Sequence, residues 1–193
     1  MDERDVFLFF YSVASSERQY HSALENLVIS FFECTGREYI SCALAFRVDE
    51  SFDGCVQREM ESDDDFCIVR YDVTHKHPLR KTVMRMSRMG GFDEQYRIRV
   101  SGEQYRDLRN FLDDEIGEPF DTVGNFLAAI PFARTIGVRS CGWRNSQLFV
   151  CALEFAGVLR RGSVNLSTVS PDAFLDAVMT DCVVEELDVV LVV

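Results

Sequence analysis

The stretch from Trp143 to Gly157 constrains the fold of this chain more than any other, because its pattern is typical of a helix that lies inside a core. Asn145 is predicted to be the N-cap, since its side-chain oxygen is suited to accept a hydrogen bond from a free amide in the first turn. Gly157 is suited to the left-handed conformation that ends a helix. Apolar residues cover most of the circumference in between, so we expect a central helix surrounded by the rest of the chain.

The composition fits a single globular domain that needs neither disulfides nor metal to fold. The chain has 193 residues, 47% of them hydrophobic, and a formal net charge of −12. That charge argues against nucleic acid and anionic membrane surfaces as partners, and favours a basic or neutral protein partner. No apolar run reaches the roughly 20 residues that span a bilayer, and the acidic N-terminus lacks the basic start of a secretory signal.

The cysteines and histidines predict neither a disulfide framework nor a metal centre. Seven cysteines occur at irregular positions, and three of them, Cys42, Cys67 and Cys151, lie inside apolar runs typical of buried free thiols. We therefore expect an intracellular, reducing compartment. His75 and His77 alternate in a predicted turn, but no Cys or carboxylate stands at ligand spacing, so no metal or other cofactor is expected.

The remaining elements predict an α+β fold in which an antiparallel sheet packs against the buried central helix. Apolar and β-branched runs predict strands at residues 5–14, 39–48, 55–58, 66–73, 81–88 and 95–100. Helical periodicity and capping signals predict helices at residues 16–34, 101–117, 122–130 and 170–179. The first 180 residues are expected to form one domain, followed by an apolar, β-prone tail over residues 181–193.

Several segments of the chain, taken in order, resemble one protein family. The segment Thr35-Gly36-Arg37-Glu38-Tyr39-Ile40-Ser41-Cys42-Ala43-Leu44-Ala45-Phe46 is similar to the helix-to-strand junction of the circularly permuted NlpC-like papain-fold proteins, many of which large DNA viruses encode. The segment Trp143-Arg144-Asn145-Ser146-Gln147-Leu148 resembles the start of that family's catalytic helix. Residues 96–100, Gln104 and residues 117–121 resemble the segments between them, so the likeness covers about residues 6–178.

The resemblance implies an inactive site. The family's nucleophilic cysteine falls on Asn145, and its base histidine falls on Ser41. Thiol chemistry needs a sulfur with a lowered pKa and an imidazole that exchanges protons near neutral pH, and these two residues supply neither. A shift of one residue would place Cys42 in the base position, and a cysteine there is not a base either.

Three functions follow from these observations. The first is a pseudoenzyme retained as a structural or interaction protein, incorporated in a virus particle. The alternative is an active thiol hydrolase or acyltransferase whose nucleophile has moved to Cys141, with only His21, His75 and His77 available as imidazoles. The third is a binding module whose former cleft holds an acyl chain or a peptide. Trp143, Cys42 and Cys141 are expected to lie at that cleft, beside Asn145 and Ser41.

The C-terminal tail is a candidate contact surface. Its β-prone, apolar sequence would promote aggregation if it were exposed, so it must pair either with its own sheet or with a neighbouring molecule. The predicted interaction residues are Val189, Val190, Leu191, Val192 and Val193. The expected partners are other proteins, among them viral structural proteins or a second copy of the chain.

Overall fold

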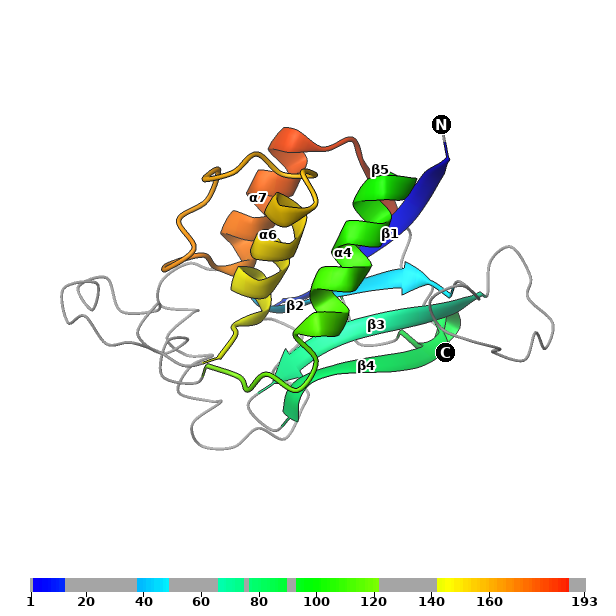
Figure 1. The fold of residues 1–193 in the computed structure, drawn as a ribbon, viewed down its shortest axis with the longest axis horizontal. Helices are drawn as coiled ribbons and strands as arrows, with labels where there is room; N and C mark the ends of the chain where they lie inside the picture. The colour runs from blue at the N-terminus through cyan, green and yellow to red at the C-terminus, as the bar shows by residue number, and fades with distance from the viewer. Residues whose placement is uncertain are drawn as a thin grey trace.

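The computed structural model describes residues 2–12, 38–48, 66–74, 77–89, 93–121 and 142–187, and these residues form an α+β fold (Figure 1). A six-stranded antiparallel sheet has the order β4-β3-β2-β1-β5-β6. Its strands are β1 (Glu3–Ser12), β2 (Tyr39–Arg47), β3 (Cys67–Thr74), β4 (His77–Arg85), β5 (Glu94–Ser101) and β6 (Val184–Leu187). The helices in the described ranges are α4 (Gly102–Asp114), α6 (Asn145–Phe155) and α7 (Pro171–Asp181), with a 3-10 turn at Met86–Arg88.

The three helices pack against one face of the sheet (Figure 1). Alternate residues of β1, such as Val6 and Leu8, belong to the same buried cluster as Leu108 of α4, Leu148 of α6 and Phe174 of α7. This alternation is what a strand produces when one of its faces meets a helical layer. The predicted α+β class and antiparallel sheet are therefore confirmed.

Helix α6 is buried, as the sequence predicts, but it begins differently. Five apolar residues of its middle are fully buried: Leu148, Phe149, Val150, Ala152 and Leu153. Its N-cap is Arg144, and Asn145 is the first helical residue, so the predicted N-cap was wrong. At the other end Gly157 has φ = 67°, and the amides of Gly157 and Val158 donate to the carbonyls of Glu154 and Leu153. This Schellman motif confirms the predicted glycine stop.

Two further helix starts are confirmed by their side-chain caps. Ser101 accepts from the amide of Gln104, and the Gln104 side chain accepts from the amide of Ser101, which completes the capping box of α4. Ser170 caps α7 by accepting from the amide of Ala173, with Pro171 at the first helical position.

Strands β4 and β1 begin two or more residues earlier than predicted. Strand β4 runs from His77 to Arg85 rather than over residues 81–88, so the predicted turn at residues 75–78 overlaps its start. Proline is tolerated there because β4 is an edge strand. Strand β1 begins at Glu3 because backbone pairing with β5 continues through polar residues to the pair Glu3 and Ser101.

Other predictions fall outside the described residues. These are the helices at 16–34 and 122–130, the strand at 55–58, and the residues His21, His75 and Cys141. Of the predicted tail, Val184–Leu187 pairs with β5 of its own sheet, which is one of the two arrangements expected for it. The interaction residues 189–193 also lie outside the described residues.

Candidate functional site

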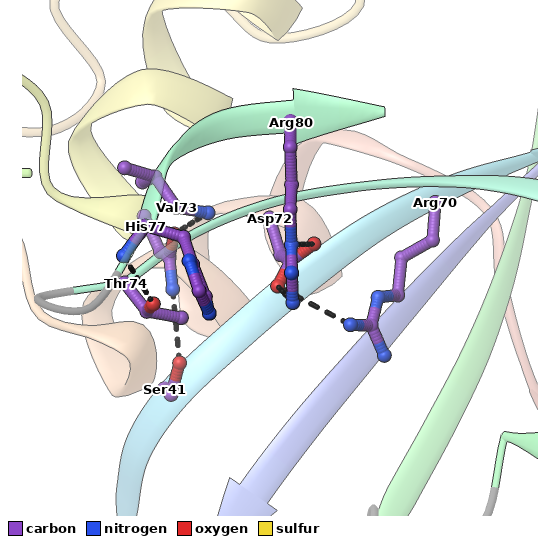
Figure 2. A network of polar contacts seen from close by, with 8 residues as sticks. Ser41, Arg70, Asp72, Val73, Thr74, His77 and Arg80 are labelled. Atoms are coloured by element: carbon purple, nitrogen blue, oxygen red, sulfur yellow. Dashed lines mark hydrogen bonds and ion pairs between the residues drawn. The ribbon is translucent and has the colours of Figure 1, made fainter. Parts of the chain in front are cut away.

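The N-terminus of α6 meets strands β2 and β3 through the side chain of Asn145. Its Nδ2 donates to Ser41 Oγ at 2.9 Å, and its Oδ1 accepts from the backbone amide of Val73 at 3.0 Å. Asn145 is buried, with 8% of its surface exposed. Figure 2 shows Ser41 on β2 and Val73 on β3 at this junction. The structure therefore brings together the two residues that the sequence assigned to the degenerate catalytic positions.

The side chain of Asn145 links β2 to β3 beyond the last residues at which these two strands pair. The pairing of β2 with β3 runs from Arg47 opposite Ile68 to Leu44 opposite Tyr71. Past that point the amide side chain of Asn145 accepts from β3 and donates to β2, as a peptide group of an inserted strand would. Because a buried amide without a partner is costly, the bond to Val73 stabilises the junction.

The segment before α6 is held in place by a close backbone contact. The amide of Trp143 donates to the carbonyl of Pro119, and the carbonyl of Trp143 accepts from the amide of Asp121. Gly142 has φ = 105°, and a Cβ at this position would lie 2.2 Å from the Pro119 carbonyl oxygen. Only glycine fits this backbone conformation at such a short distance from Pro119. The contact at Gly142 therefore determines where α6 begins.

Trp143 is half-buried and anchored at both ends of its side chain. Its Nε1 donates to Glu115 Oε2 at 2.7 Å, and its ring contacts the ring of Phe111 with centroids 6.4 Å apart. Both partners belong to the C-terminal part of α4 and the residue after it. Trp143 thus ties the start of α6 to the end of α4.

A cluster of charged residues lies on β3 and β4 near this junction. The buried carboxylate of Asp72 pairs with Arg70 at 3.2 Å and with Arg80 at 3.4 Å (Figure 2). Burial raises the pKa of Tyr11, an effect that Arg70 opposes and Asp72 reinforces. His77 is exposed, and its backbone amide donates to Thr74 Oγ1. Sequence reasoning missed this cluster, although Asp72 directly opposite Arg80 is a recognisable cross-strand pair once the hairpin register is known.

Three thiols of the described residues, those of Cys42, Cys151 and Cys182, have properties opposite to those of a nucleophile. Cys42 is 1% exposed and lies in the core between sheet and helices, and burial raises its pKa well above the usual value. Burial raises the pKa of Cys151 to about 11, with Glu154 and Glu115 adding to the effect. Burial, with Asp181, also raises the pKa of Cys182 to about 11. A reactive cysteine requires a lowered pKa.

Two hollows on the surface lie away from this junction. One, of about 390 Å³, is lined by Glu3, Arg4, Asp5, Arg47, Val48, Arg99 and Tyr105. The other, of about 380 Å³, lies beside α7, where Val169 and Ala173 are among its lining residues. Ser41, Asn145 and Trp143 line neither of them.

Comparison with protein families, with characterised proteins and with solved structures yields no match for this chain. None of the helices described above combines the length and the apolar character that crossing a bilayer requires. Within the same residues, no group of three or more His, Cys, Asp and Glu side chains is arranged to hold a metal ion.

Proposed function

We propose that this chain is a catalytically inactive protein of the permuted NlpC-like papain type, which acts as a structural or interaction protein. The observation that carries the proposal is the contact between Asn145 and Ser41. The resemblance assigns these residues, 104 positions apart, to the nucleophile and the base of one site, and they lie within hydrogen-bond distance of each other.

The arrangement of the junction supports the family assignment. The resemblance places the nucleophile at the start of the catalytic helix and the base in the segment of a helix-to-strand junction. Asn145 is the first residue of the buried helix α6, and Ser41 lies on β2, a central strand of the sheet. A helix N-terminus in this position would favour a thiolate if a cysteine were present.

The chemistry of the junction supports inactivity. An amide and a hydroxyl neither form a thiolate nor exchange protons near neutral pH. Both functional groups of the Asn145 side chain are already engaged, one with Ser41 and one with Val73. The bridge therefore serves to join α6, β2 and β3, which is a structural task.

The proposed setting is a virus particle or its assembly inside a reducing compartment. This step rests on the likeness to proteins of large DNA viruses and on analogy of fold, with support from two properties of the chain. Its net charge of −12 suits a basic or neutral protein partner. The seven cysteines stand at irregular positions that suit free thiols rather than a disulfide framework, as expected in a reducing compartment.

Thiol reactivity as a function of pH tests the proposal. In the unmodified protein we expect slow labelling by a thiol-reactive probe at and below about pH 8, because an unactivated cysteine has a pKa near 8.5 or higher. One cysteine that reacts fast at lower pH would support the alternative of an active thiol enzyme with its nucleophile at Cys141. Fast labelling would then have to disappear in Cys141→Ser.

Restoring the family's residues tests the papain-like assignment itself. We expect Asn145→Cys to introduce one new reactive thiol, and Asn145→Cys combined with Ser41→His to lower the pH at which that thiol reacts, because a neighbouring imidazolium stabilises a thiolate. Asn145→Cys combined with Ser41→Ala is the matched control. Equal pH profiles for the histidine and alanine double variants would contradict the assignment.

A further inference from the structure

The two edges of the sheet carry opposite charge. Edge strand β4 contains four basic or titratable nitrogen side chains, His77, Arg80, Lys81 and Arg85. The opposite edge strand, β6, has the sequence Val-Glu-Glu-Leu and contains Glu185 and Glu186. An edge strand presents backbone donors and acceptors to any strand that approaches it, and charge decides which strand is accepted.

The strand directions allow the sheet to continue from one molecule into the next. Each strand is antiparallel to its neighbours in the order β4-β3-β2-β1-β5-β6, so β4 and β6 run in opposite directions. A second copy placed beside the first in the same orientation brings its β6 antiparallel to the first copy's β4. The helices of the two copies then cover the same face of one continuous sheet.

In β4 the backbone of Val83 faces the outer side of the sheet. The amide of Met86 donates to Phe66 on the β3 side, and by strand alternation Val83 directs its amide and carbonyl away from β3. At Leu79 the same outer side is occupied, because Leu79 exchanges backbone bonds with Gly117 and Glu118. Within the described part of the chain, the backbone position open to a partner strand is therefore Val83.

Exposed apolar residues mark both edges. The Val83 side chain is 47% exposed, and Val183, directly before β6, is 91% exposed. Contact of Val83 with β6 of a second copy, and of Val183 with β4 of a second copy, would remove apolar surface from water. Pairing of the two edges need not break the ion pairs of Lys81 with Asp113 and of Glu185 with Arg97. The negative charge that β6 offers to β4 is supplied by the exposed side chain of Glu186.

We propose that β6 of one copy pairs with β4 of a second copy, giving a head-to-tail assembly through the sheet edges. The register that places Glu186 opposite Lys81 also places Val184 opposite Val83. Pairing of two β4 edges, or of two β6 edges, would oppose like charges and is disfavoured. Such a heterologous contact builds a ring or an open filament rather than a closed dimer. The proposal depends on the sheet edges and not on Asn145 and Ser41, so it stands or fails separately from the proposed function.

Blocking one edge at a time tests this assembly. Val83→Pro removes the outward amide of β4, and Glu186→Lys reverses the charge of β6. Val83→Thr and Asp114→Lys are the matched controls, since the first keeps the amide and the second makes the same charge change at an exposed residue at the end of α4. Sedimentation velocity over a range of protein concentrations measures association, and thermal unfolding verifies that each variant is folded. If Val83→Pro does not fold, Val83→Glu keeps the amide and places a like charge opposite β6.

We expect the unmodified protein and both controls to form species larger than dimers as concentration rises. Each edge variant should associate at least about tenfold more weakly, in line with a cost of about 1.4 kcal/mol for the lost contacts. An equimolar mixture of the two edge variants should form heterodimers, because one intact β6 meets one intact β4. Monomers at all concentrations of the unmodified protein, or a mixture that associates no better than either variant alone, would overturn the proposal.

Discussion

Asn145 and Ser41, 104 positions apart in the chain, are joined by a 2.9 Å hydrogen bond from the side-chain amide to the hydroxyl. The same amide group accepts from the backbone of Val73, so a single side chain links a helix to two strands. Asn145 and its bond from Val73 are buried, which makes the loss of that bond costly. It is therefore the point where a substitution tests both the stability and the proposed ancestry of the site.

We expect Asn145→Ala to lower the free energy of unfolding by about 1–3 kcal/mol, because it leaves the amide of Val73 buried without its partner. Ser41→Ala should cost about 0.5–1.5 kcal/mol, since it removes only the acceptor of the Asn145 amide. The double variant should cost less than the sum, because the two side chains share one bond. Urea unfolding of the four proteins measures the coupling.

Ser167→Ala is the control for this cycle, since Ser167 is exposed and, among the described residues, its amide and hydroxyl bond only to the nearby Asn165. We expect its effect to stay within about 0.5 kcal/mol. If Asn145→Ala costs no more than Ser167→Ala, then the bridge does not stabilise the fold.

Much of the fold follows from local sequence signals, and the exceptions have a tertiary cause. The capping residues Ser101 and Ser170 and the stop at Gly157 act within a few residues of themselves, so the sequence identifies them. Asn145 carries the same local signal for an N-cap, but two strands lie within reach of its side chain and bind it instead. Nothing near Asn145 in the chain indicates those partners.

The candidate site was predictable only in part for the same reason. Asn145 and Ser41 emerge from the resemblance and not from periodicity or spacing, because their types alone carry no catalytic signal. The third member, the backbone amide of Val73, has no side-chain signal at all. The pairing of Asp72 with Arg80 depends on the register of the β3–β4 hairpin. The sequence did not predict this register, because it placed the start of β4 at residue 81 instead of His77.

Gly142→Ala tests whether the close approach to Pro119 sets the position of α6. A Cβ there would meet the Pro119 carbonyl oxygen at 2.2 Å in a backbone conformation that L residues rarely adopt. We expect a loss of at least about 2 kcal/mol in the free energy of unfolding, together with a changed emission of Trp143, the only tryptophan.

Gly162→Ala provides the matched control for that substitution. Gly162 has φ = 74°, but a Cβ there meets nothing within 4 Å, so it isolates the conformational cost from the steric one. We expect Gly162→Ala to lower the free energy of unfolding by about 1 kcal/mol and to leave the emission spectrum of Trp143 unchanged. Similar losses and spectra for the two variants would mean that the contact with Pro119 does not matter.

The stability of the pairing between β6 and β5 should depend on pH through the ionisation of Glu185. Its hydrogen bond from Arg97 lowers the pKa of this exposed carboxyl below the usual value, so the ionised form is favoured in the folded state. The stabilisation is then present above the unfolded pKa of about 4.3 and is lost as the pH falls through the lowered folded value.

Hydrogen exchange of the amides in Val184–Leu187, measured from neutral to acidic pH, reports the change. Glu185→Gln should show weaker protection than the unmodified protein at neutral pH, and the difference should vanish in acid. In dilute protein, where β6 does not contact a second copy, Glu186→Gln should follow the unmodified protein throughout. Protection that falls in parallel for the unmodified protein and Glu185→Gln would show that this ion pair does not secure the edge strand.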